Sequence, residues 1–309
     1  MRIVVTGGCG YIGSALVRVL LANGHDVDVI DLQWFGRNLP TGSRLRVLKC
    51  DFRDAALWQF LINTDCVIHL AAVANDPCGE LDPKLTWEIN ALGTEQLIDA
   101  AVRAGVPRFI YASSGSVYGL KNETHVTEDL QCVPLSEYNK TKMVAERVVT
   151  SYADKMIVQI LRPATVCGWS PRTRLDVAVN ALTIGALSKG AITVYGGDQM
   201  RPNLHIVDMV RAYEFLLACP DVRGIYNVGQ ENMSINEIAE LVQSECGGDV
   251  VVRPSTDPRS YRLDSSKFKR AGFHYTESVA SAVRDLVQAY RDGRLVDSDN
   301  GYNLRVMPR

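Results

Sequence analysis

The segment Thr6-Gly7-Gly8-Cys9-Gly10-Tyr11-Ile12-Gly13 follows directly after the apolar run Ile3-Val4-Val5 and comes before a helical pattern. In such a strand–turn–helix unit, Gly7 permits a sharp turn, Gly10 lets the backbone approach a phosphate, and Gly13 lets the helix pack closely on the strand. The helix then begins with free N–H groups that face the anion. The segment therefore predicts a site for a dinucleotide diphosphate, with a plain tight turn as the alternative.

A second predicted strand, residues 27–30, ends at Asp31, which lies 18 residues after Gly13. A carboxylate at this position accepts hydrogen bonds from the ribose hydroxyls of a dinucleotide and repels a 2′-phosphate. Asp31 therefore favours NAD over NADP. The alternative is that Asp31 is an ordinary turn residue. Arg37 nearby could in principle favour the phosphate, but it lies well past the end of the strand.

Composition excludes several classes of protein. The 309 residues are 47% hydrophobic, which is enough for one large core or two unequal ones. The 33 basic and 35 acidic residues nearly balance, and no basic run indicates nucleic-acid binding. No apolar run of about 18 residues predicts a membrane span, and the N-terminal strand leaves no room for a signal peptide. The eight cysteines and five histidines lack metal-ligand spacing, so we expect free thiols, a cytoplasmic location and no metal.

Apolar strand-like runs alternate with helical patterns through the first half of the chain; the runs include residues 46–50, 66–70, 109–112 and 156–161. This alternation predicts an α/β fold: a Rossmann-type, doubly wound parallel sheet with helices on both faces. After about Thr165 the alternation weakens, which predicts a smaller, mixed C-terminal substrate domain. We expect residues 1–165 to bind NAD, with 201–228 returning to that domain, and residues 166–200 and 229–309 to bind a nucleotide sugar.

Tyr138 and Lys142 stand four residues apart at the start of a helical run, on one face of the helix. A neighbouring ammonium stabilises a phenolate and lowers the pKa of the phenol, so this pair could move a proton at a substrate hydroxyl. By itself, the spacing also fits a solvated helix face. The hydroxyl of Ser114, which follows a predicted strand, could donate to a developing carbonyl.

These patterns occur in one order along the chain: the glycine segment, Asp31, Asp51-Phe52, His69-Leu70-Ala71-Ala72, Asn90, Ser114 and Tyr138-x-x-x-Lys142. With these residues the chain resembles the extended short-chain dehydrogenase/reductase superfamily, in its nucleotide-sugar epimerase/dehydratase branch, and is similar to UDP-glucose/UDP-galactose 4-epimerase. The resemblance covers nearly the whole chain. It includes residues 161–168, 201–208 and 257–261 in the second half.

The resemblance implies a role for each matching residue. The implied catalytic residues are Ser114, Tyr138 as general base, and Lys142. Those implied to bind NAD are Gly7, Gly10, Tyr11, Ile12, Gly13, Asp31, Asp51, Phe52, Leu70, Ala71, Ala72, Asn90, Tyr138, Lys142 and Pro163. Those implied to bind the nucleotide sugar are Ser114, Tyr138, Thr165, Asn180, Arg201 and Arg259. Phe52 also fits a plain core position, and Asn90 also fits a helix cap.

One departure separates the reactions of this branch. Its 4,6-dehydratases carry an Asp-Glu pair straight after the catalytic hydroxyl residue, whereas this chain has Gly115 and Ser116. This argues against dehydration and leaves oxidation of the hydroxyl at C4, followed by epimerisation or by release of a keto sugar. The leading hypothesis is an NAD-dependent nucleotide-sugar epimerase that acts through a 4-keto intermediate. A nucleotide-sugar 4-dehydrogenase or 4-ketoreductase on the same site is the alternative, and a non-catalytic NAD-binding regulator is a distant one. The arginine-rich segment 169–180 resembles a subgroup that contains both 4-dehydrogenases and epimerases.

Members of this branch commonly pair through the helix of the Tyr-x-x-x-Lys motif and the helix before it. The candidate apolar faces here are Leu92, Gln96, Leu97, Ala100, Val144, Ala145 and Val148. We therefore expect a homodimer. Burial of these faces against the protein's own sheet is the alternative.

Overall fold

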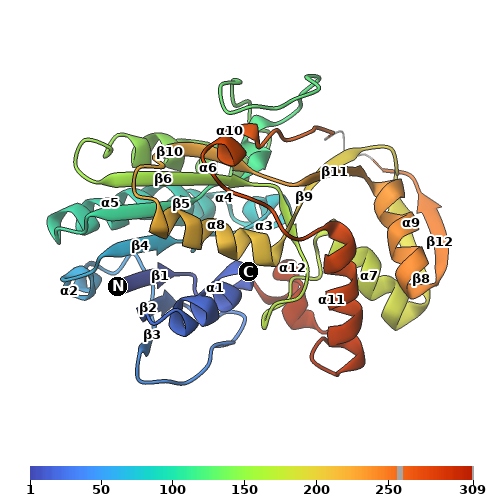
Figure 1. Ribbon diagram of the computed structural model, residues 1–309, viewed down its shortest axis with the longest axis horizontal. Coiled ribbons are helices and arrows are strands. Elements are labelled where there is room, and N and C mark those ends of the chain that lie inside the picture. The colour runs from blue at the N-terminus through green and yellow to red at the C-terminus, as the bar shows by residue number, and fades with distance from the viewer. Residues whose placement is uncertain (256–259, 308–309) are drawn as a thin grey trace.

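A computed structural model describes residues 1–255 and 260–307 and contains one large parallel sheet (Figure 1). The order of its seven strands is β10-β6-β5-β4-β1-β2-β3. They are β1 (Arg2–Thr6), β2 (Asp26–Asp31), β3 (Leu45–Lys49), β4 (Cys66–His69), β5 (Arg108–Ala112), β6 (Ile157–Pro163) and β10 (Gly224–Val228). Every neighbouring pair is parallel. The predicted Rossmann-type fold class is confirmed.

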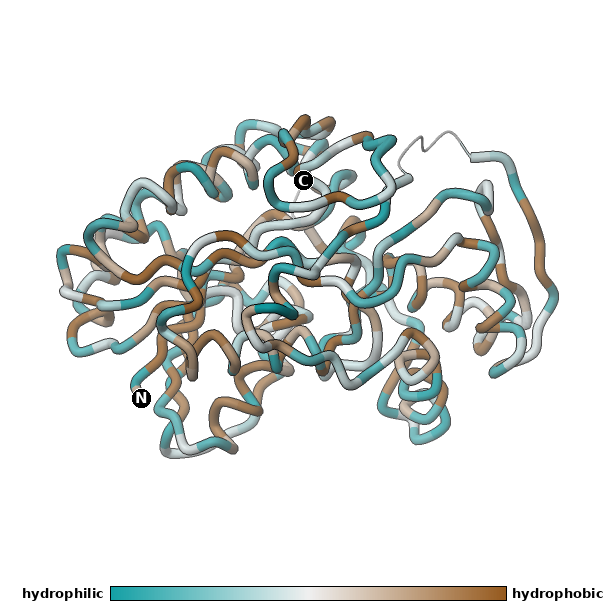
Figure 2. The backbone as a smooth tube through the Cα atoms, turned by 45° about the horizontal axis from the view of Figure 1, so that its top comes forward, coloured by the Kyte–Doolittle hydropathy of each residue, from teal (hydrophilic) through white to brown (hydrophobic). Residues whose placement is uncertain are grey.

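Alternate residues of the central strands face two separate apolar cores. Ile3 and Val5 of β1 pack with α1 (Tyr11–Ala22) and α8 (Ile206–Ala218) on one face of the sheet. Val4 packs with α5 (Gly93–Arg103) and α6 (Glu137–Thr150) on the other face. Because both faces are covered, the inner strands β1, β4 and β5 consist mainly of buried apolar residues. Brown stretches follow the backbone near the N-terminus in Figure 2.

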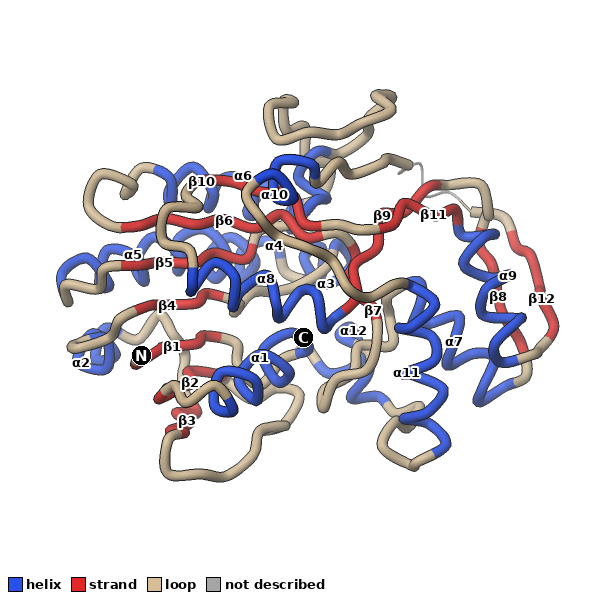
Figure 3. The backbone as a smooth tube through the Cα atoms, in the orientation of Figure 1, coloured by secondary structure: helices blue, strands red, loops and turns tan. Residues whose placement is uncertain are grey.

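The second half of the chain adds two small sheets beside the large one (Figure 3). One is mixed and consists of β7 (Thr165–Cys167), β9 (Met200–His205) and β11 (Glu231–Ser234). The other pairs β8 (Ala191–Tyr195) with β12 (Asp249–Arg253). The helices α7 (Ala178–Lys189), α9 (Ile235–Cys246) and α11 (Val279–Arg291) pack around them. The segment 201–228, expected to return to the NAD-binding domain, is divided between the sheets: β10 lies in the large sheet, whereas the residues of β9 lie in the mixed one. The division into domains stays a prediction.

Short helices lie in the connecting segments: α2 (Trp58–Leu61), α3 (Asp76–Leu81), α4 (Pro83–Trp87), α10 (Ser266–Arg270) and α12 (Asn303–Val306). A wider π-helical stretch at Glu88–Leu92 comes before α5 and continues into it. Near the C-terminal end, α12 contacts α3. The last helix of the structure therefore lies beside the loop that follows β4.

Other expectations concern cysteines, metals and membranes. All eight cysteines are free thiols, as expected. Within residues 1–255 and 260–307, no group of three His, Cys, Asp or Glu residues has the arrangement of a metal site. No helix in the same part of the chain is long and apolar enough to cross a membrane.

The helical faces expected at a dimer interface are only partly available. Leu97 of α5 is 3% exposed and Ala145 of α6 is fully buried, because both pack on the protein's own sheet. Leu92 is 52% exposed, and Gln96 beside it is exposed too. Ala100, Val144 and Val148 are partly exposed. The homodimer stays a prediction, with a surface that lacks Leu97 and Ala145 and keeps Leu92, Gln96, Ala100, Val144 and Val148.

Candidate active site

A cleft opens at the carboxyl ends of the central strands, above the turn between β1 and α1. Its lining includes Gly7, Gly10, Tyr11, Ile12, Gly13, Asp31, Trp34, Phe35, Asp51, Phe52, Leu70, Ala71, Ala72, Ala74, Ala112, Arg172, Arg174 and Asn303. Parallel sheets bind their ligands at this edge, because the loops that follow the strands meet there.

The glycine turn has the close contacts that the sequence predicts. Gly7 has a φ of +74°, and a Cβ there would lie 2.6 Å from the backbone nitrogen of Ala71. A Cβ on Gly13 would overlap the carbonyl oxygen of Gly7. Gly10 caps α1 without a side-chain hydrogen bond, which leaves the N–H groups of the first turn for an anion. This cradle fits a dinucleotide diphosphate.

Asp31 is fixed at the end of β2 by two backbone hydrogen bonds. Its Oδ2 accepts from the N–H of Cys9 at 2.9 Å, and its Oδ1 accepts from the N–H of Gln33 at 2.6 Å. Burial raises the pKa of Asp31, and the two backbone hydrogen bonds oppose that rise. The carboxylate thus faces the cleft in one orientation, as recognition of a ribose requires.

The other residues expected to bind the cofactor divide into two groups. Asp51, Phe52, Leu70, Ala71 and Ala72 line the cleft. Asn90 and Pro163 are not part of that lining.

Asn90 is fully buried and connects two elements of the site. Its Oδ1 accepts from the N–H of Val73 at 2.9 Å, and its Nδ2 donates to Val73 O and to Thr141 Oγ1 of α6. Asn90 lies inside the π-helical stretch, so it does not act as a helix cap. Its contacts fit a positioning role for α6.

Ser114, Tyr138 and Lys142 lie together next to this cleft. Lys142 is 3% exposed, its Nζ donates to the carbonyl of Ala112 at 2.8 Å, and it lies 6.0 Å from the ring centre of Tyr138. Ser114 Oγ accepts from the N–H of Ser116 at 3.2 Å and is 2.6 Å from Ser116 Oγ. The start of α6 and the end of β5 therefore bring a phenol, an ammonium and a hydroxyl to one place.

The electrostatics of this trio differ from the expectation. Burial raises the pKa of Tyr138 to about 12, and Arg174 is the cation that most opposes the rise. A hydrogen bond with Ser114 also lowers the pKa of Tyr138, while Asp76 raises it. Burial lowers the pKa of Lys142 to about 7. In this structure Arg174, rather than Lys142, is the neighbouring charge that favours the phenolate.

The residues expected to bind the nucleotide sugar are more dispersed. Thr165 begins β7 and is partly exposed, and Arg201 of β9 donates through Nη1 to the carbonyl of Met200 at 3.2 Å. Asn180 is fully buried, where its Oδ1 accepts from Gly168 N at 2.9 Å and its Nδ2 donates to Arg174 O at 2.8 Å. These contacts give Asn180 the role of holding the segment before α7. Arg259 lies outside the described residues.

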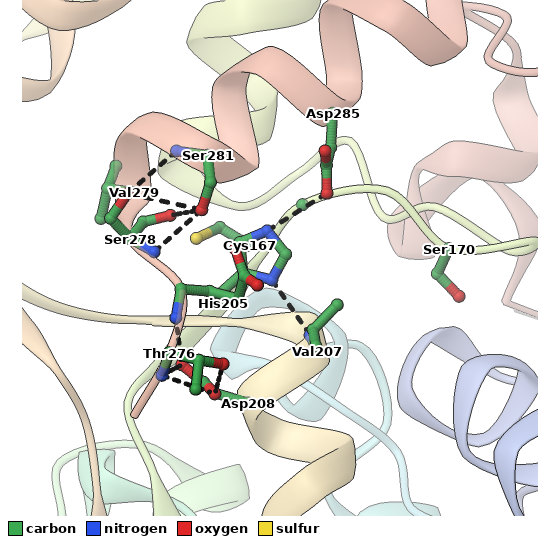
Figure 4. A network of polar contacts seen from close by, with 12 residues as sticks. Cys167, Ser170, His205, Val207, Asp208, Thr276, Ser278, Val279, Ser281 and Asp285 are labelled. Atoms are coloured by element: carbon green, nitrogen blue, oxygen red, sulfur yellow. Dashed lines mark hydrogen bonds and ion pairs between the residues drawn. The ribbon is translucent and has the colours of Figure 1, made fainter. Parts of the chain in front are cut away.

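A polar network around His205 joins the start of α8 to α11 and to the residues just before α11 (Figure 4). His205 is 1% exposed, and its Nδ1 accepts from the N–H of Val207 at 3.1 Å. The proton of the neutral ring is therefore on Nε2, which faces Asp285 Oδ2 of α11 at 3.4 Å. Asp208 accepts from the N–H groups of Thr276 and Glu277, just before α11. Because α8 also packs on α1, this network fixes α11 relative to the cleft.

Several residues of the cleft escaped the sequence reasoning. Trp34, Phe35, Arg172, Arg174 and Asn303 all line it. Arg172 and Arg174 lie in the arginine-rich segment 169–180. Two arginines close together after a strand could have been predicted to contribute to a binding site for an anionic ligand. Asn303 had no such signal, because it comes from a short helix far along the chain.

The parallel sheet, the glycine turn and the Tyr138–Lys142 pair are together those of an extended short-chain dehydrogenase/reductase. The profile of the NAD dependent epimerase/dehydratase family matches residues 3–229, so the chain belongs to that family and NAD is its cofactor. The cradle around Gly7 and Gly13 and the fixed Asp31 carboxylate fit this cofactor.

Three comparisons illustrate the range of the family. The uncharacterized UDP-glucose epimerase YtcB of Bacillus subtilis is 31% identical over 92% of this chain and 95% of its own. The structure of MoeE5 in complex with UDP-glucose and NAD is 31% identical, with a TM-score of 0.85 over 95% of this chain and 99% of MoeE5. The dTDP-glucose 4,6-dehydratase of Streptomyces niveus is 27% identical over 95% of this chain and 94% of its own. Relatives thus include both epimerases and dehydratases.

Proposed function

We propose that this protein is a nucleotide-sugar 4-epimerase. One observation carries the proposal: Ser114, Tyr138 and Lys142 lie together beside the cofactor cleft, while Gly115 and Ser116 follow the catalytic hydroxyl. A 4,6-dehydratase of this branch needs an acid and a base at the latter two positions, and these residues supply neither.

The trio acts on the hydroxyl at C4 of the sugar. Tyr138 takes the proton of that hydroxyl in its phenolate form, which burial opposes and Arg174 favours, and the Ser114 O–H donates to the oxygen that becomes the C4 carbonyl. The chemistry that bound NAD would supply is a hydride acceptor for the C4 hydrogen and a hydride donor to the opposite face of the resulting carbonyl. Tyr138 then returns the proton, so the substrate and its C4 epimer have the same atoms and the same oxidation state.

The relatives support a choice of nucleotide. YtcB is named as a UDP-glucose epimerase, and MoeE5 binds UDP-glucose and NAD. We therefore propose a UDP-hexose as the substrate class. Arg201 of β9 and Arg259 are the residues we propose for the diphosphate of this substrate, and Thr165 is proposed near its nucleotide.

The test is product analysis. The protein is incubated with UDP-, GDP-, dTDP- and CDP-hexoses and catalytic NAD, and the products are identified by NMR while absorbance at the reduced nicotinamide band is followed. The C4 epimer of a UDP-hexose, without net NADH, is the expected result. Stoichiometric NADH with a keto sugar would identify a 4-dehydrogenase, and a 4-keto-6-deoxy sugar would identify a dehydratase; either result refutes the proposal.

A further inference from the structure

Arg172 is a buried cation that forms no ion pair with a carboxylate of the described residues, although the charge of Asp176 acts on it. Its side chain belongs to a residue that is 3% exposed. Its Nη2 donates to Asn303 Oδ1 at 2.7 Å, its guanidinium lies 3.7 Å from the ring centre of Phe35, and its Nε has no hydrogen-bond partner in the described part of the chain. A buried charge left unpaired is destabilising, so this arrangement calls for an anion.

The backbone around Arg172 is attached to the first turn of α1. The N–H of Arg172 donates to Ser14 Oγ at 3.3 Å, and Ser170 Oγ donates to the carbonyl of Tyr11 at 2.8 Å. Arg172 also lines the cleft together with Gly10 and Tyr11. The positive end of the α1 dipole and the guanidinium therefore act on the same space.

We propose that Arg172 donates hydrogen bonds to the diphosphate of bound NAD and that Asn303 positions its guanidinium. A planar guanidinium matches phosphate oxygens with two parallel donors, which suits it to this ligand better than an ammonium. Burial, with Arg174 as the second cause, lowers the pKa of Arg172 to about 10, so the side chain is charged at neutral pH. The proposal requires NAD binding and is independent of the sugar and of the reaction at C4.

Asn303 extends this role to the C-terminal part of the chain. Its N–H donates to Asp176 Oδ2 at 3.2 Å and its Nδ2 donates to the carbonyl of Ala74 at 3.4 Å. The carbonyl of Gly301 accepts from the N–H of Leu175 at 2.8 Å. The C-terminal segment is thereby held against the loop that carries Arg172, and its Asn303 amide reaches the guanidinium.

A purely structural role for Arg172 makes a different prediction. If the side chain served only to pack the segment against α1, a methionine of similar length would do so without a buried charge. The affinity for every ligand of the cleft would then change together. A contact with the diphosphate instead weakens only the ligands that carry phosphate.

The experiment compares Arg172→Met with the wild-type protein by isothermal titration of the NAD-free protein with NAD, ADP-ribose and adenosine. We expect affinity for NAD and for ADP-ribose to fall about 10- to 100-fold, as for the loss of a hydrogen-bonded charge, with adenosine binding unchanged. Arg18→Met, on the exposed face of the same helix α1, is the matched control and should leave all three affinities unchanged. Unchanged NAD affinity in Arg172→Met, or an equal loss for adenosine, would overturn the proposal.

Two further variants keep the test decisive. Arg172→Lys retains the charge with a compact donor, so it should bind NAD and ADP-ribose more tightly than Arg172→Met does. If Arg172→Met fails to fold, Arg172→Lys is compared with the wild-type protein instead. We then expect its affinity for NAD and ADP-ribose, but not for adenosine, to fall by less than about 10-fold. Asn303→Ala should weaken NAD and ADP-ribose but not adenosine, because it releases the guanidinium. If Asn303→Ala leaves NAD affinity unchanged, its positioning role is refuted.

Discussion

Arg162 Nη2 lies 2.6 Å from Glu146 Oε2, and both side chains are about 95% buried. Glu146 stands one helical turn after Lys142 on α6. Glu146 also accepts from Ser113 Oγ, next to Ser114, which we propose as a catalytic residue. The pair therefore connects β6, α6 and the loop after β5 from behind the proposed catalytic trio.

Removing one charge of this pair should be strongly destabilising. Glu146→Gln leaves the Arg162 guanidinium buried without a counter-ion, and we expect the free energy of unfolding to fall by about 3–5 kcal/mol. The double variant Glu146→Gln/Arg162→Met should recover most of that loss. Urea unfolding measures both variants, and Asp292→Asn, which breaks the exposed Arg294–Asp292 pair, should have little effect on stability. A loss in Glu146→Gln as small as that in Asp292→Asn would contradict the expectation.

Tyr138 should control both the rate and its pH dependence. Tyr138→Phe removes the base and retains the ring, so turnover should fall by about 10²–10⁴ with NAD binding intact. Arg174→Met removes the main opposing charge, so the pKa of Tyr138 should rise from about 12 and the rising limb of the pH–rate profile should move to higher pH. Near wild-type turnover by folded Tyr138→Phe would exclude Tyr138 as the base.

Asp31 should select the cofactor. Its carboxylate repels a 2′-phosphate, so we expect NAD to bind at least ~10-fold more tightly than NADP, and Asp31→Asn to reduce that ratio. Asp26→Asn, at the exposed start of the same strand, is the control. Fluorescence titration with both cofactors provides the measurement, and equal affinities in the wild-type protein would reject the assignment.

His205 should make stability depend on pH. Burial lowers its pKa in the folded protein, with Asp285 opposing, while the unfolded chain titrates near about 6.5. Its contribution is therefore present above pH 6.5 and is lost as the pH falls through the lower folded pKa. His205→Asn keeps an acceptor for the N–H of Val207 and removes this titration, so the decrease in stability between about pH 6.5 and 5 should be smaller than in the wild-type protein. Thermal unfolding across this range checks the difference, and parallel curves would be inconsistent with it.

The predicted homodimer can be tested at Leu92. This side chain is 52% exposed just before α5, and Leu92→Arg should separate the subunits. Leu120→Arg, at a loop residue that is 47% exposed, should leave the assembly unchanged. Light scattering at micromolar concentration gives the mass of the assembly, and a monomeric wild-type protein would contradict the predicted homodimer.

The sequence predicted the parts of this structure that have local signals. The strands around Val4, Val29 and Ile110 are short apolar runs between helical patterns, and the glycine turn has a fixed spacing, so the large sheet and the diphosphate cradle could be inferred. The mixed sheet of β7, β9 and β11 could not, because β9 contains Pro202 and its pairing joins segments far apart. Asn303 was missed for the same reason: its place in the cleft depends on packing of α12 against α3, which no spacing encodes.

The position of β10 at one edge of the large sheet has a consequence for synthesis of the chain. Its partner β6 ends at Pro163, and 60 residues, 164–223, separate that strand from Gly224. At about 5–20 residues per second, a ribosome exposes the open edge of β6 for roughly 3–12 s before β10 emerges to cover it. An uncovered strand edge pairs readily with another chain. Crowded nascent chains should therefore aggregate through β6, and a chaperone that shields this edge should raise the yield of folded protein.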